Sequence, residues 1–287
     1  MSEPDASLST NPGMARNRRL KPTIVIVPGY NEPDDDMSTL SDGRRGKPGL
    51  KARGYECIAF PRIADDLSDR IDRYAEFLDK LKVQGVPFPI VSLGYSLGGL
   101  VVRGFLRKYP ERAADVSHTI TLATPHWGIT VDMLPMMTAF LRLRDHAMHD
   151  LGIRSKFMHW LNQTRGHWVG RWRHRNWVLD DEPWVAPPDT CLFSICGIVP
   201  RFGDDNDGIV WRDSATLDGR IHSIDVRDDR ANHLNLIGAW NLGTTLIKRF
   251  KFDDDVWPRS IAAIADHIEA HVVPAAVEAA AQKTAAS

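Results

Sequence analysis

The sequence is poor in cysteine, has no long apolar run and carries almost no net charge. Its three cysteines are scattered and form no Cys-x-x-Cys pair, which excludes a disulfide framework and a zinc or redox motif of that type. No run approaches the roughly 18 apolar residues of a membrane span, and the N-terminus has no apolar signal region. We therefore expect a soluble, cytoplasmic protein.

The balance of charge excludes a further class of partner. The chain has 36 basic and 37 acidic residues and a formal net charge of −1. A chain this close to neutrality has no overall field that would attract nucleic acid or an anionic membrane. We expect a small-molecule substrate and no nucleic-acid partner, while the oligomeric state stays open.

The most informative stretch is Pro89 to Leu106, where an apolar strand-like run meets Gly-Tyr-Ser-Leu-Gly and then an apolar-periodic helix. A serine at such a turn must adopt strained backbone angles, and small neighbours at Gly94 and Gly98 let the backbone pack closely around it. The turn thus displays the side chain of Ser96. The helix N-terminus adds backbone N–H groups and a positive dipole end that favour a developing oxyanion.

Strand-like and helix-like patterns alternate along the chain. Apolar or alternating runs predict strands at 23–27, 55–60, 89–93, 116–123, 190–196 and 221–226. Amphipathic patterns predict helices at 67–81, 97–109, 234–249 and 255–271. This alternation is typical of an α/β fold with a mostly parallel central sheet and helices on both faces.

Composition divides the chain into an arm, a core, an insertion and a tail. Residues 1–21 lack periodicity and are expected to form a flexible arm, and the alanine-rich residues 274–287 a C-terminal tail. The core is expected at 22–129 and 190–273. Residues 130–189 are rich in methionine and tryptophan, with apolar residues at helical spacing, and are predicted to form an inserted helical cap.

Chemistry at Ser96 needs partners, because a serine hydroxyl is a weak nucleophile unless a base accepts its proton and a carboxylate orients that base. In enzymes with this kind of turn the acid and then the base follow the serine in the chain. His233 is the candidate base, since the other late histidines fall in a strand or on the terminal helix. Asp207, which precedes Gly208, is the candidate acid, with Asp205 as the alternative.

Two backbone N–H groups are candidates to hold the oxyanion that attack by the serine would create. Leu97 follows the serine directly, and Tyr30 lies in the glycine-containing loop after the first predicted strand. The alternative for that loop is an ordinary turn at the end of a strand.

Residues that line a substrate pocket are predicted from position and composition. His126 and Trp127 end a strand at the sheet edge where open α/β sheets bind ligands. Met133 and Met137 belong to the predicted cap, whose large adaptable side chains suit an apolar acyl group. The same side chains would also serve to attach the cap to the core or to form a dimer contact.

Four short motifs, in chain order, resemble those of the α/β-hydrolase superfamily. They are Gly-Tyr-Ser-Leu-Gly-Gly, Thr-Pro-His-Trp-Gly, Asn-Asp-Gly-Ile-Val and Asn-His-Leu. Within the superfamily they look most like bacterial lipases and esterases and the lipase-like acyl hydrolases that deacylate glycolipid anchors. The resemblance covers about 23–128 and 190–250. It implies an esterase that uses Ser96, Asp207 and His233 and needs no cofactor.

Two positions depart from the family pattern. The usual His-Gly of the first oxyanion loop is Pro28-Gly29 here, which removes a side-chain hydrogen bond but keeps the backbone donor. Several of these lipases bind calcium through an Asp two residues after the histidine, where this chain has Asn235, which speaks against a metal site. An amidase, a thioesterase or an acyltransferase, or a binding protein with a remnant site, remains an alternative.

Overall fold

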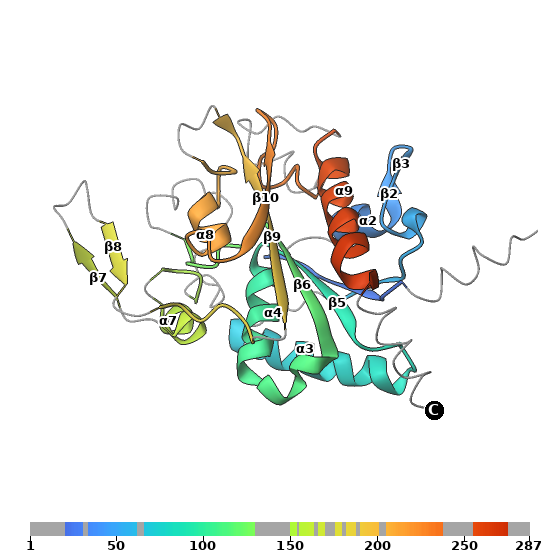
Figure 1. Ribbon diagram of the computed structural model, residues 1–287, viewed down its shortest axis with the longest axis horizontal. Helices are drawn as coiled ribbons and strands as arrows, with labels where there is room; N and C mark the ends of the chain where they lie inside the picture. The colour runs from blue at the N-terminus through green and yellow to red at the C-terminus, as the bar shows by residue number, and fades with distance from the viewer. Residues whose placement is uncertain are drawn as a thin grey trace, which may run out of the picture.

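The computed structural model describes residues 21–30, 34–61, 66–129, 150–153, 155–163, 166–169, 176–179, 182–187, 190–200, 205–237 and 255–274. A six-stranded sheet forms the centre of the molecule (Figure 1). Its strands are β1 (Ile24–Val27), β4 (Cys57–Ala59), β5 (Ile90–Tyr95), β6 (Val116–Leu122), β9 (Cys191–Ile198) and β10 (His222–Arg227). All six predicted strands are therefore present, with ends shifted by a residue or two.

The sheet has the order β10-β9-β6-β5-β1-β4, and its strands pair in parallel throughout. The strand β5, which leads to Ser96, lies between β1 and β6 and so has neighbours on both sides. Every residue of β1 is at most 1% exposed, which explains its continuous run of β-branched side chains.

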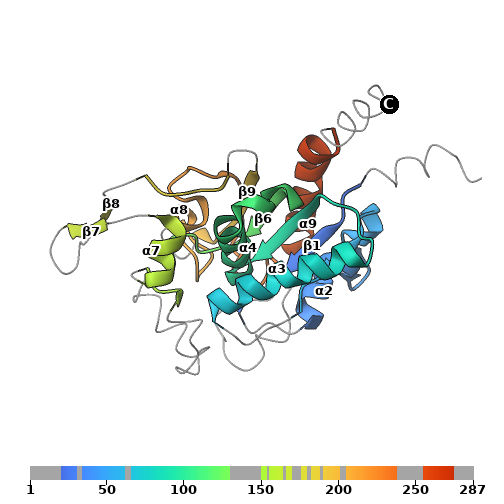
Figure 2. The ribbon, with the colours of Figure 1, turned by 90° about the horizontal axis from the view of Figure 1, so that it is seen from below.

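Helices cover both faces of this sheet (Figures 1 and 2). The helices of the described residues are α2 (Asp34–Asp42), α3 (Leu67–Val83), α4 (Leu97–Lys108), α7 (Lys156–Asn162), α8 (Arg212–Thr216) and α9 (Trp257–His267), which continues as a π-helix over Ile268–Val272. Of these, α7 packs beside α4. One apolar core joins α3, α4 and α7 to Val25 of β1, and a second core joins α2 and α9 to Ile24. The predicted α/β fold with a parallel sheet between helical layers is confirmed.

Several short elements have no counterpart in the sequence analysis. The helix α2 offers only two apolar positions, Met37 and Leu40, within an acidic and polar sequence. The antiparallel hairpin of β2 (Gly43–Arg44) and β3 (Lys47–Pro48) and the 3-10 turns at Lys51–Arg53 and Pro110–Asp115 are also short. Elements of this length contain too few residues for a hydrophobic period to be visible.

The described part of residues 130–189 contains a β-hairpin as well as a helix. Strands β7 (Gly166–Val169) and β8 (Asn176–Leu179) pair in antiparallel fashion and project from the molecule near α7 (Figures 1 and 2). Three residues of α7 enter the core under α3 and α4, namely Phe157, Met158 and Leu161. The predicted arm and tail, and most of the predicted helix at 234–249, lie outside the described residues.

Three histidine rings cluster where the C-terminal end of α9 packs against the sheet. The ring of His267 stacks on Phe193 of β9, with ring centroids 3.9 Å apart and an interplanar angle of 8°. The rings of His118 and His271 lie 6.1 Å and 4.8 Å from it. Burial, together with the neighbouring charges of His271, His118 and His222, lowers the pKa of His267 to about 4. The ring is therefore neutral at physiological pH.

Within the described part of the chain, no helix has the length and apolar character needed to cross a membrane.

Candidate active site

Ser96 occupies a strained turn between β5 and α4. Its backbone angles are φ 50° and ψ −122°, and its N–H donates to the carbonyl of Leu122 on the neighbouring strand at 2.8 Å. A Cβ atom on Gly94 would lie 2.5 Å from Gly99 Cα, and one on Gly98 would lie 2.2 Å from the carbonyl oxygen of Val27. Glycine at these two positions is therefore what allows the strand, the turn and the helix to close around the serine.

The structure brings Ser96, His233 and Asp207 into one chain of contacts. Ser96 Oγ lies 3.0 Å from His233 Nε2, and His233 Nδ1 lies 2.8 Å from Asp207 Oδ2. The histidine and the aspartate are 4% and 1% exposed. Asp205, the alternative acid, is instead exposed and forms an ion pair with Arg227 at 2.9 Å. Of the two acids considered, Asp207 is thus the one that contacts the histidine.

Backbone donors fix the carboxylate of Asp207. Its Oδ1 accepts from the N–H groups of Ile209 and Val210 at 2.9 and 2.7 Å, which leaves Oδ2 directed at His233. The turn requires Gly208, whose φ is 93°. We assign the proton of His233 to Nδ1, because the carboxylate accepts only, and the lone pair on Nε2 then faces the serine hydroxyl.

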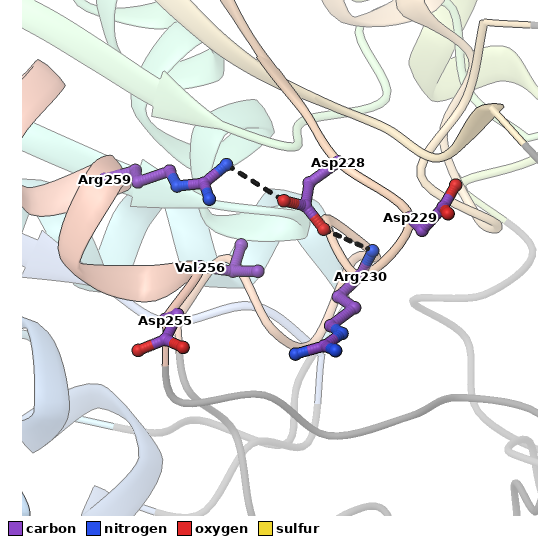
Figure 3. Close-up of a pocket in the computed structure, with 6 residues that line it drawn as sticks. All are labelled: Asp228, Asp229, Arg230, Asp255, Val256 and Arg259. Atoms are coloured by element: carbon purple, nitrogen blue, oxygen red, sulfur yellow. Dashed lines mark hydrogen bonds and ion pairs between the residues drawn. The ribbon is translucent and has the colours of Figure 1, made fainter.

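The loop that carries His233 is tied to α9. Asp228 accepts from the backbone N–H of Arg230 at 3.0 Å and pairs with Arg259 of α9 at 3.1 Å (Figure 3). These residues line an open polar hollow of about 430 Å³ on the protein surface. The side chain of Asn235, which the sequence analysis compared with the calcium ligand of several lipases, donates to the carbonyl of Arg230 at 2.8 Å and so holds the loop backbone. No group of three or more His, Cys, Asp or Glu among the described residues is arranged to hold a metal ion.

The loop after β1 lies against the start of α4, where the predicted oxyanion donors are found. The carbonyls of Val27 and Pro28 approach the position that a Cβ of Gly98 would take. Buried Arg70 donates to the carbonyl of Gly29 at 3.5 Å. Because the C=O and N–H of a trans peptide point in opposite directions, this contact favours a Tyr30 N–H directed away from the guanidinium of Arg70.

Leu97 is the first residue of α4, where backbone N–H groups have no partner within the helix. The roles of Leu97 and Tyr30 as oxyanion donors remain predictions.

The predicted pocket residues are found in different settings. His126 is fully buried, with Nδ1 3.2 Å from Arg103 Nη1 and Nε2 3.2 Å from Thr121 Oγ1. Trp127 is partly exposed and donates from its indole nitrogen to Asp218 at 3.1 Å. Substrate contact by either residue remains a prediction, and for His126 it would require the ring to be uncovered. Met133 and Met137 lie outside the described residues.

Arg103, a buried charged residue in contact with His126, is one that the sequence analysis missed. It lies on α4, is fully buried and donates to the carbonyls of Trp184 and Val185 at 2.5 and 3.1 Å and to Asn162 Oδ1 at 3.1 Å. Burial, with a smaller contribution from Arg107, lowers the pKa of Arg103 to about 9. The guanidinium thus joins the serine helix to α7 and to the segment 182–187. The available signal was a charge in the middle of an otherwise apolar stretch of helix, whose two other charged residues, Arg107 and Lys108, lie in its last turn.

The comparisons with known proteins agree with the fold. No protein family matches the sequence, and no curated protein matches it. Among solved structures, a mature lipase from Bacillus licheniformis superposes with a TM-score of 0.53 at 19% identity, over 82% of this chain and 90% of that chain.

A metagenomic carboxyl esterase superposes with a TM-score of 0.55 at 17% identity, over 87% and 76% of the two chains. A lipase B of Aspergillus fumigatus superposes with a TM-score of 0.50 at 13% identity, over 91% of this chain and 65% of that chain. Identities this low establish the fold alone. The chain therefore has the α/β-hydrolase fold.

Proposed function

We propose that the protein is a serine hydrolase that cleaves carboxylic esters through an acyl-enzyme intermediate. The observation that carries the proposal is the contact of Ser96 Oγ with His233 Nε2 at 3.0 Å, at a strained turn that displays the serine. The contact of His233 with Asp207 supports it, because a buried carboxylate selects the tautomer in which Nε2 can accept a proton. The spatial similarity to lipases and esterases is consistent with it.

In the proposed first half of the cycle, Ser96 Oγ attacks the ester carbonyl carbon while its proton passes to His233 Nε2. Asp207, held by backbone donors, stabilises the imidazolium that results. The C–O bond to the alcohol then breaks, the leaving oxygen takes the proton from Nε2, and the acyl group remains on Ser96 Oγ.

In the second half, His233 accepts a proton from water as that water attacks the acyl carbon. The bond to Ser96 Oγ breaks, the serine recovers its proton and the carboxylic acid leaves. No cofactor takes part in this cycle. The N–H groups of Leu97 and Tyr30 would hold the oxyanion of both tetrahedral intermediates. In a serine protease, removal of one such donor lowers kcat by about 100- to 1,000-fold.

We further propose an ester with an apolar acyl group as substrate. The segment 130–189 is rich in methionine and tryptophan, which present large adaptable apolar surfaces. Met133 and Met137 from this segment, with His126 and Trp127 from the turn after β6, would contact the acyl chain.

Fluorophosphonate labelling tests the proposal at the level of the nucleophile. The wild-type protein is expected to be labelled, and Ser96→Ala and His233→Ala to resist labelling, while all three unfold at similar temperatures. An unlabelled wild-type protein would favour the alternative of a binding protein with a remnant site, and label retained in Ser96→Ala would exclude Ser96 as the labelled nucleophile.

A substrate panel tests the bond that is cleaved. p-Nitrophenyl esters of increasing acyl length are compared with thioesters and amides of matched chains. We expect esters to have the highest kcat/KM, with a rise as the acyl chain lengthens. Faster turnover of a matched thioester or amide, or acyl transfer to an added alcohol in preference to water, would replace the esterase with that activity.

A further inference from the structure

We propose that Tyr95, the residue before the serine, is a positioning residue that holds the base against its nucleophile. Its hydroxyl bonds to the backbone carbonyl of His233 and so fixes the main chain from which the imidazole projects. The proposal rests on the proposed function, since it assigns a role within that same site.

The contact links two distant parts of the chain. Tyr95 is the last residue of β5 and is fully buried, and its hydroxyl donates to the His233 carbonyl at 2.9 Å. The two residues are 138 positions apart in the sequence. The rings also lie close together, with centroids 5.1 Å apart at an interplanar angle of 39°. One side chain therefore contacts both the main chain and the ring of the base.

Both peptide groups of His233 are fixed, one by the acid itself and the other by the residue next to the nucleophile. Its N–H donates to the carbonyl of Asp207 at 3.0 Å, and its C=O accepts from Tyr95, which is bonded covalently to Ser96. The acid thus holds one side of the base and the neighbour of the nucleophile holds the other. Displacement of His233 from Ser96 would break the Tyr95 hydrogen bond, because Tyr95 cannot follow without moving the central strand.

The expected size of the effect follows from the precision that proton transfer needs. A misplacement of about 1 Å at reacting groups can cost on the order of 100-fold in rate, and a buried acceptor left without its donor corresponds to about 5- to 150-fold. Tyr95→Phe keeps the ring and its packing and removes only the hydroxyl. We expect kcat to fall about 5- to 30-fold, with KM within about twofold of the wild-type value.

Tyr74→Phe is the matched control. Tyr74 of α3 is also fully buried, and its hydroxyl lies 2.6 Å from Oγ of Ser92 in β5. Each variant therefore removes one hydroxyl from one buried hydrogen bond. We expect a similar loss of thermal stability in both variants and a loss of kcat in Tyr95→Phe alone.

A readout without substrate separates this proposal from the proposed function. The Nδ1 proton between His233 and Asp207 is expected to give a low-field proton NMR signal, which Tyr95→Phe should shift or broaden and Tyr74→Phe should leave unchanged. If the wild-type protein cleaves no ester but the signal responds in this way, the hydrolase fails and the positioning role stands. If both variants match in kcat, in fluorophosphonate labelling rate and in this signal, Tyr95 is only a packing residue and the proposal is overturned.

Discussion

Replacement of Asp207 by asparagine should reverse the proton arrangement on the base. The two backbone N–H groups at Oδ1 can bond only to an acceptor, so the amide oxygen of the introduced asparagine must occupy that position. Its NH2 group must then face His233 Nδ1, which now has to accept. The histidine therefore carries its proton on Nε2 and cannot take one from Ser96.

The expected fall in kcat of Asp207→Asn follows from the loss of general-base catalysis in a protein that keeps its fold. The same change in unrelated Ser-His-Asp enzymes lowers kcat by about 10,000-fold through the wrong tautomer. Both backbone hydrogen bonds at Oδ1 survive in Asp207→Asn, so we expect a loss of about 1,000- to 10,000-fold in kcat at neutral pH. The melting temperature should stay within a few degrees of the wild-type value.

The assay is steady-state hydrolysis of a short-chain p-nitrophenyl ester, with Asp205→Asn as the control. Asp205 is exposed and paired with Arg227, so its substitution should leave kcat within about twofold of the wild-type value. An Asp207→Asn variant that keeps more than a tenth of wild-type kcat would refute the role assigned to this carboxylate. So would an equal loss in the two variants.

Two further predictions concern stability. Arg103→Met should lower the free energy of unfolding in urea by about 2–4 kcal/mol, because the buried side-chain oxygen of Asn162 and the partly buried carbonyls of Trp184 and Val185 lose their donor. The exposed Arg73→Met is the control, and equal effects of the two substitutions would contradict the network. The lowered pKa of His267 means that the unfolded chain binds its proton more readily than the folded chain between about pH 6.5 and about pH 4. Stability should therefore be greatest above that window and fall as the pH drops through it, by at most about 1.4 kcal/mol per pH unit for this ring. His267→Phe should weaken the dependence of the free energy of unfolding on pH, measured by urea titrations across this window. Equal dependence on pH in the wild-type protein and the variant would contradict the prediction.

The sequence predicts the sheet and the strained turn at Ser96 well, because both depend on local patterns. Six short apolar or alternating runs became six strands, since a buried parallel strand needs such a run wherever it lies. Gly94 and Gly98 flank Ser96 because the close approaches they permit occur within a few residues of the turn or at the adjoining strand. Asp207 and His233 could be singled out by motif and chain order, and the structure brings them into contact.

The remaining features depend on contacts between distant residues, which leave no local pattern. The hydroxyl of Tyr95 bonds to a carbonyl 138 positions away in the sequence. The apolar run before the serine does not indicate that this position needs a hydroxyl. Arg103 is stabilised by carbonyls from a segment some 80 residues later. The sequence favoured Asp207 but kept Asp205 as an alternative, because the final choice depends on which carboxylate the turn at Gly208 directs inward.

The central claim is that Ser96 becomes a nucleophile through its contact with His233. The most direct measurement is acid-quench trapping of an acyl-enzyme, followed by intact-protein mass spectrometry and peptide mapping after a pulse with a slowly released ester. We predict one added acyl group, located on the peptide that contains Ser96 and missing from His233→Ala within the same pulse. An acyl group on another residue, or hydrolysis that proceeds in Ser96→Ala, would contradict the account.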